Sequence, residues 1–168
     1  MHQSRTLKPR YGYSQATPQA VTLKADYDFT KGDIYPGTVM TRLAGNVVTV
    51  CDGTNAPAGL SGSWAAPTFG IDEVRGRGGS YDMSLWVLGP DSVMAASKPA
   101  FDATANWTTA KTELTAGKAV YLKANAKGLL TLETAHAVKT AQTIAKLVDV
   151  ESSDTIIIAG TEPAGATA

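Results

Sequence analysis

Residues 32–62 constrain the fold of this chain more than any other stretch. They read GDIYPGTVMTRLAGNVVTVCDGTNAPAGLSG, in which turn-forming residues separate two short runs rich in apolar side chains. Residues 38–43 alternate between two faces, as in a strand with one covered side. Glycine and asparagine in residues 44–46 supply a reversal, and the β-branched run 47–51 follows. This pattern predicts a β-hairpin, followed at 52–59 by a loop with too many breakers for regular structure.

The order of these features resembles the core of the capsid decoration, or cement, proteins of tailed bacteriophages. The residues that carry the resemblance are the Pro36-Gly37 turn, the strand pair, the Asp52-Gly53 loop and Ala58-Gly59-Leu60, within a similarity that covers roughly residues 20–95. The resemblance implies a short β-rich body with an N-terminal arm. It also implies a structural protein on the outer surface of the phage head that stabilises the head by bridging capsomers, commonly as a homotrimer. The implied partners are the major capsid protein and further copies of the chain, and the implied location is the virion, after synthesis in the bacterial cytoplasm.

The predicted fold class is mostly β: a small antiparallel β-barrel or sandwich built from hairpins, with an extended N-terminal arm and at most one or two short helices. Charged residues make up 18% of the 168 residues, and Thr, Ala, Gly and Val are abundant, as in a β-rich globular protein. We expect an extended basic arm at 1–20, a β-rich decoration domain at 21–160 and a flexible tail at 161–168. A further division of the domain places sub-units at 21–96 and 112–160.

The middle of the chain predicts a second firm strand. Residues 81–88 are largely apolar on both faces toward their C-terminal end, which indicates burial on both sides. We expect residues 92–96 to return antiparallel to this strand. Asp102 is a candidate cap for a short helix at 103–107.

The C-terminal third predicts two more hairpins. Residues 117–132 repeat the plan of the first hairpin, with a longer turn. Residues 143–150 and 155–159 predict the last hairpin. Between them, residues 133–142 are consistent with either a helix or an extended loop, because alanines favour the first and threonines the second.

The N-terminal arm and one glycine-rich loop carry the candidate partner contacts. Residues 1–25 contain basic side chains and no acid, and their prolines prevent a long regular element. A segment of this kind either lies on a partner or is a disordered tail. Tyrosines suit interface pockets, and arginines grip carboxylates. The candidate capsid-binding residues are Arg5, Lys8, Arg10, Tyr11, Tyr13, Arg75 and Arg77.

Leu60 and Trp64 are the candidates for an oligomer interface. They lie in an apolar loop after the first hairpin, and exposed apolar loops and strand edges need covering.

Other function classes lack their sequence signals. Basic and acidic residues balance at 15 each, so we expect no specific nucleic-acid partner and no membrane partner. The single Cys51 forms no intrachain disulfide, and His2 and His136 have no zinc-site spacing. Residues 59–63 lack the nucleophile-elbow spacing, and Asp72-Glu73 point to opposite faces of an extended segment. We therefore predict no enzyme, no catalytic residue, no metal site and no cofactor.

One alternative function comes from the three tryptophans. A β-sandwich adhesive or carbohydrate-binding module of a phage fibre or surface layer would use Trp64, Trp86 and Trp107 as sugar platforms. The competing interpretation places these side chains in the core or in an interface.

Overall fold

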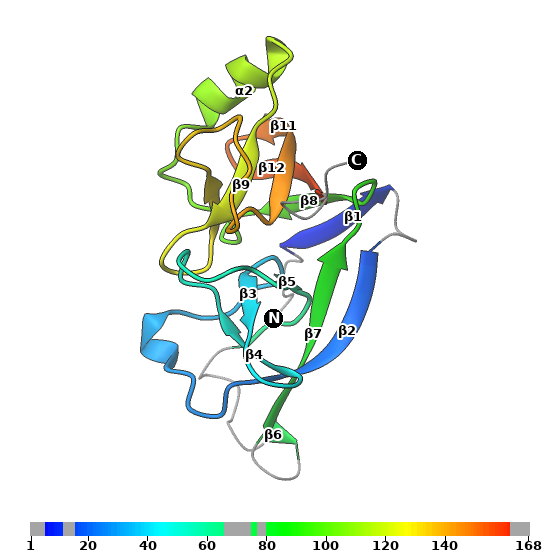
Figure 1. Cartoon of the computed structure of the whole chain (residues 1–168), viewed down its shortest axis with the longest axis vertical. Helices are drawn as coiled ribbons and strands as arrows, with labels where there is room; N and C mark the ends of the chain where they lie inside the picture. Colours follow the sequence, from blue (N-terminus) through cyan, green and yellow to red (C-terminus); the bar gives the residue numbers. More distant parts are fainter. Residues whose placement is uncertain (1–5, 12–15, 66–74, 77–79, 162–168) are drawn as a thin grey trace.

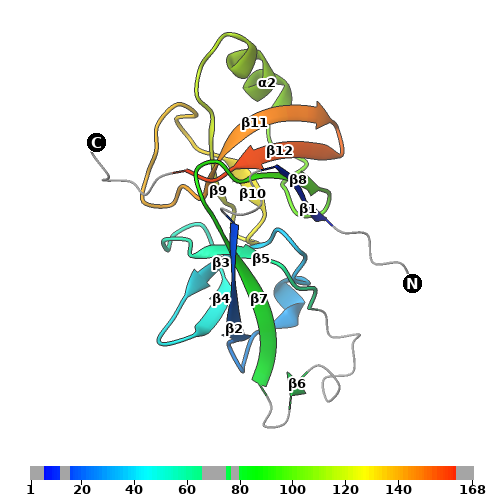
Figure 2. The same ribbon diagram turned by 90° about the vertical axis from the view of Figure 1, so that its right-hand side faces the viewer.

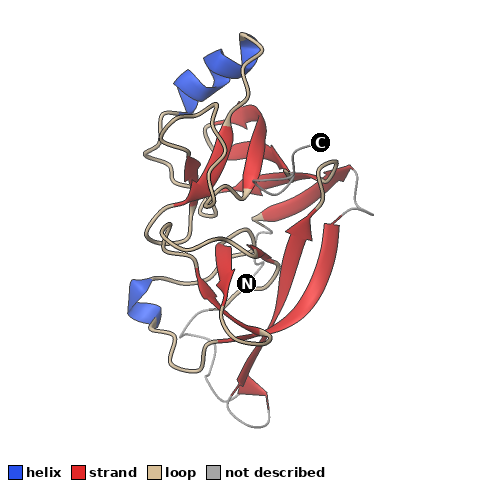
Figure 3. Cartoon of the chain, viewed as in Figure 1, coloured by secondary structure: helices blue, strands red, loops and turns tan. Residues whose placement is uncertain are grey.

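The computed structural model describes residues 6–11, 16–65, 75–76 and 80–161 (Figure 1). Within these ranges the chain forms twelve strands, one α-helix and one short 3-10 helix (Figure 3). The strands divide between two six-stranded assemblies, which we call the barrel lobe and the sheet lobe. The predicted fold class, mostly β with a small barrel and at most one or two short helices, is confirmed. No helix in the described ranges has the length and apolarity needed to cross a membrane.

The barrel lobe closes on itself. Its strands are β2 (Ala16–Leu23), β3 (Val39–Arg42), β4 (Val47–Val50), β5 (Gly59–Ser61), β6 (Arg75–Gly76) and β7 (Ser80–Leu88). They follow the order β2-β4-β3-β5-β7, and β7 pairs with β2 again, so five strands form a closed ring. The short β6 pairs with the beginning of β7. Closure gives each of these five strands a hydrogen-bonded neighbour on both sides.

The predicted first hairpin is β3 and β4, which pair antiparallel across the turn at residues 44–46. Both faces of β3 are buried, whereas the sequence pattern indicated one covered face. Met40 points into the core of the barrel with Val48 and Leu85, and Val39 belongs to a second core that the two lobes share. The strand therefore lies between two cores, which a short alternating pattern does not reveal.

The sheet lobe is an antiparallel sheet covered by the helix α2 (Trp107–Thr115). Its strand order is β1 (Leu7–Tyr11), β8 (Val93–Ser97), β12 (Thr155–Ala159), β11 (Ala145–Ser152), β9 (Tyr121–Ala124) and β10 (Leu130–Leu132). The predicted hairpins at 117–132 and 143–159 are β9-β10 and β11-β12. Ala110 of α2 is fully buried in the shared core, and Figure 2 shows the helix lying over the sheet.

The barrel lobe is inserted between two neighbouring strands of the sheet lobe. β1 precedes the barrel in the sequence and β8 follows it, yet they pair antiparallel, with Leu7 opposite Ala96 and Tyr11 opposite Val93. The expected return of residues 92–96 onto the strand at 81–88 is therefore wrong. β8 crosses into the other lobe, where β1 and β12 supply its hydrogen bonds. Residues 7–11 and 16–20, which the sequence suggested as part of an arm, are extended strands within the two sheets.

The helix begins later than predicted. Asp102 does not cap it, because its carboxylate accepts hydrogen bonds from the Thr104 backbone and hydroxyl and so forms a tight turn. Asn106 is the N-cap, and its Oδ1 accepts the Thr109 N–H at 3.1 Å. Residues 133–142, for which two conformations were open, contain turns and no helix.

A shared core and close backbone contacts hold the two lobes in a fixed arrangement. The shared core contains Val39 and Leu60 from the barrel lobe, along with many residues of the sheet lobe. The Val39 N–H donates to the Gly128 carbonyl at 2.8 Å across the junction. Gly53 has φ +83°, and a Cβ there would lie 2.6 Å from the Ala124 carbonyl oxygen of β9. The lobes therefore approach more closely at Gly53 than any side chain would permit.

Candidate interaction surfaces

The described part of the predicted N-terminal contact set lies on β1, at one edge of the sheet lobe. Lys8 and Arg10 are exposed. Arg10 Nη2 forms bonds of 2.8 and 3.1 Å to the two carboxylate oxygens of Glu151, and the side chains are 46% and 49% exposed. The backbone of Tyr11 pairs with Val93. This edge therefore presents basic groups, one of which already has an acidic partner.

Three of the other candidate contacts lie outside the described residues: Arg5, Tyr13 and Arg77. The backbone of Arg75 lies in β6, opposite Tyr81 of β7. The structure therefore brings together Lys8, Arg10 and Tyr11 on one strand, and it places Arg75 on the other lobe.

The two predicted oligomer-interface residues differ in exposure. Leu60 on β5 is 0% exposed, so its side chain packs inside the chain and has no surface to offer to a second copy. The expectation of an exposed apolar loop is wrong here because β5 is a central strand between β3 and β7. Trp64 is half-buried and packs edge-to-face on Tyr35, with ring centroids 4.7 Å apart.

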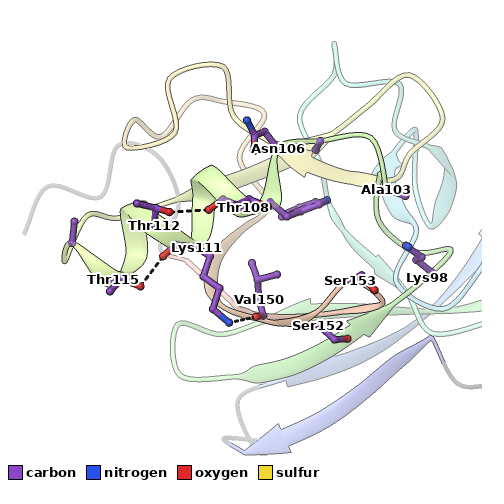
Figure 4. A pocket seen from close by; sticks show the side chains of 13 residues that line it. Lys98, Ala103, Asn106, Thr108, Lys111, Thr112, Thr115, Val150, Ser152 and Ser153 are labelled. Atoms are coloured by element: carbon purple, nitrogen blue, oxygen red, sulfur yellow. Dashed lines mark hydrogen bonds between the residues drawn. The ribbon is translucent and has the colours of Figure 1, made fainter.

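A groove between α2 and the β11-β12 hairpin, which we call the α2 groove, is a surface feature that sequence reasoning did not predict (Figure 4). Its volume is about 800 Å³. Its lining includes Lys98, Trp107, Thr108, Lys111, Val150, Ser152 and Ser153. Lys111 spans the groove, and its Nζ donates to the Val150 carbonyl at 2.6 Å. The groove arises from tertiary packing of a helix on a distant hairpin, so no local pattern in the sequence marks it.

A repeated three-residue turn shapes the loops of both lobes. In each copy an aspartate Oδ1 accepts hydrogen bonds from the backbone N–H and the hydroxyl of a threonine two residues later. The pairs are Asp28 with Thr30, Asp52 with Thr54, and Asp102 with Thr104. The threonine hydroxyl is the main cause that lowers the pKa of each carboxyl below its usual value. The Asp-x-Thr spacing, present in the sequence at all three places, could have predicted these turns.

A buried carboxylate organises the loop between β10 and β11. Glu133 is 2% exposed, and its Oε1 accepts the hydroxyls of Thr140 and Thr143 at 2.8 and 2.7 Å. Lys123 Nζ lies 4.0 Å from its other oxygen. These bonds hold an irregular segment in one conformation, since buried charges need partners.

The described residues gather no set of three or more His, Cys, Asp or Glu side chains that could hold a metal ion. Burial is the first cause that raises the pKa of the Cys51 thiol, and its Sγ lies 3.4 Å from the Asn55 carbonyl oxygen. Cys51 is therefore a packed core residue in an environment that disfavours the reactive thiolate.

Comparison with known families gives one match along the whole chain. A family model described as phage cement protein matches residues 1–168. No curated protein and no solved structure matches the chain.

Proposed function

The chain belongs to the phage cement protein family, and from this premise we propose that it stabilises the assembled phage head by bridging neighbouring capsomers. Membership of the family makes the protein a structural, non-enzymatic component that decorates the capsid surface of the virion. In our proposal each copy contacts two capsomers, and three copies associate as a homotrimer on the shell.

The stiff junction between the lobes is the observation that carries this proposal. A bridge must hold two contact surfaces at a fixed separation, because a free hinge would let the joined capsomers move apart. The core shared by both lobes, the hydrogen bond from Val39 to Gly128 and the close approach at Gly53 all oppose hinge motion. One lobe can therefore lie on each capsomer while the distance between them stays constant.

We assign the first contact to the exposed basic groups of β1. Lys8 and Arg10 can pair with carboxylates of the major capsid protein. The present bond between Arg10 and Glu151 is roughly half exposed, so breaking it to free Arg10 for a capsid carboxylate costs little free energy. Arg5, Tyr11, Tyr13, Arg75 and Arg77 complete the proposed contact set.

The stabilisation follows from mass action. A protein that binds the assembled shell and not its separate subunits lowers the free energy of the shell. In a trimer, binding of one copy to the shell would hold the other two copies close to their own sites, so that individually weak contacts with the capsid add up. The half-buried Trp64 is the surface that we propose for contact between copies.

The test compares assembled shells with dissociated capsid subunits. Bridging predicts that the protein cosediments with empty shells, raises their disruption temperature, and binds separate subunits far more weakly. Equal affinity for shells and separate subunits would contradict bridging and leave simple decoration. Sedimentation analysis of the protein, free and on shells, tests the trimer, and a monomer in both states would exclude it.

Paired variants test the contact surface. Replacing Lys8 and Arg10 with Ser should lower shell occupancy and flatten its salt dependence, because exposed ion pairs are screened over roughly 8 Å at physiological ionic strength. The matched control replaces the exposed Lys118 and Lys146 of the sheet lobe with Ser, which changes the charge equally. A larger loss from the control pair would move the contact away from β1.

A further inference from the structure

The α2 groove has the size of a ligand site. Its volume of about 800 Å³ lies within the range of about 300–1,000 Å³ typical of small-molecule pockets. One wall is α2 and the other is the turn of the β11-β12 hairpin (Figure 4). Both walls belong to the sheet lobe, and Lys111 ties them together through its bond to the Val150 carbonyl.

Trp107 provides a fixed aromatic surface in this groove. Its indole Nε1 donates to the Asp102 carbonyl at 2.7 Å, and its ring packs edge-to-face on the buried Phe101, with centroids 5.4 Å apart. The side chain remains partly exposed and lines the groove. An aromatic ring held on two sides loses little further freedom when a ligand stacks on it.

The two lysines that line the groove each have an aspartate close by. Lys98 Nζ lies 3.1 Å from Asp154 Oδ1, and Lys111 Nζ lies 3.8 Å from Asp149 Oδ1. Each aspartate offsets the charge of its lysine, which reduces the attraction of the groove for phosphate, nucleic acid or an acidic peptide. The rest of the polar lining consists largely of hydroxyl groups, among them those of Thr108 and the exposed Ser152 and Ser153.

We propose that the α2 groove binds a neutral carbohydrate, with the Trp107 indole stacked against the apolar C–H face of one sugar ring. Sugars combine such a face with hydroxyls that both donate and accept hydrogen bonds. The groove offers the same combination, an aromatic surface beside hydroxyls and lysines that each have an aspartate close by. This binding activity is separate from capsid decoration, and it gives a decorated head a means of attaching to glycans.

The test uses the full chain labelled with ¹⁵N and titrated with maltotriose, cellotriose and chitotriose as neutral probes. Sialyllactose and inorganic phosphate are the anionic probes. Amide shifts from at least one neutral probe should saturate at millimolar concentrations and concentrate in residues 106–116 and 150–153. Trp107→Ala should weaken this binding about tenfold or more through loss of stacking area.

Companion variants separate binding from folding. Trp107→Phe keeps an aromatic ring and should retain most of the affinity, whereas Ser153→Arg fills the groove from an exposed position and should abolish binding. Trp86→Phe, on β7 and outside the groove, should leave sugar binding unchanged. Shifts outside the groove, saturation by anionic probes alone, no shift with any neutral probe, or full affinity of the Ser153→Arg variant would each overturn the assignment. Shell cosedimentation of the same variants reports capsid attachment separately, so the two functions can fail independently.

Discussion

Replacing Gly53 with alanine should destabilise the protein through the junction between its lobes. Gly53 has φ +83°, and its new Cβ would lie 2.6 Å from the Ala124 carbonyl oxygen, a backbone atom of β9. Holding alanine in a left-handed conformation costs about 1–2 kcal/mol, and relieving the overlap costs about 1–3 kcal/mol more, as for overpacked cores. We therefore expect the free energy of unfolding to fall by about 2–5 kcal/mol.

Gly117 supplies a matched control for the backbone term. Its φ is +77°, and an added Cβ would meet nothing within 4 Å. Gly117→Ala should therefore cost about 1–2 kcal/mol from backbone strain alone. Urea unfolding followed by circular dichroism gives both values, provided that the slopes against urea agree with the wild type. Equal losses in the two variants would refute a tightly packed junction, and with it the stiffness that bridging requires.

Two further predictions concern buried and hydrogen-bonded carboxylates. Glu133→Ala should lower the free energy of unfolding by about 3 kcal/mol, because it leaves two threonine hydroxyls without their acceptor; the half-exposed Glu151→Ala should change it by less than about 1 kcal/mol in the same urea titration. Asp102→Asn should make the free energy of unfolding fall less steeply as the pH is lowered into the acid range. The hydrogen bond from Thr104 lowers the pKa of Asp102, so its contribution is complete above the usual value of 3.8 and is lost as the pH falls through the lower folded-state pKa. Unfolding midpoints measured above and below pH 3.8 test this, and equal acid sensitivity of variant and wild type would contradict it.

Local features of the chain could be predicted from sequence because short-range chemistry decides them. The hairpins β3-β4, β9-β10 and β11-β12 each join an apolar or β-branched run to a turn, and all three form. The long strand β7 was also evident from its apolar residues. Pairing between distant segments was not predictable in this way. β1 pairs with β8 across the whole barrel, and no pattern within residues 7–11 identifies that partner.

The candidate interaction surfaces were less predictable than the fold, because they too depend on contacts between distant segments of the chain. The basic residues Lys8 and Arg10 were visible in the sequence and are exposed. Their partner Glu151 lies near the other end of the chain, so only the folded sheet brings it to Arg10. The expectation that Leu60 is exposed is wrong because β5 lies between β3 and β7, and this strand order cannot be read from local composition. The α2 groove depends on the packing of α2 over a hairpin formed some forty residues later, which local periodicity does not encode.

The insertion of the barrel between β1 and β8 dictates the order in which a nascent chain can fold. β1 leaves the ribosome first, but the strand that pairs with it is synthesised after the entire barrel. The barrel can therefore close before β1 has a partner strand on either edge. Lys8, Pro9 and Arg10 lie in this unpaired strand, and their charges and the proline discourage it from pairing with other newly made chains. The residues that we propose for capsid contact should thus also discourage wrong strand pairing while the chain is being translated.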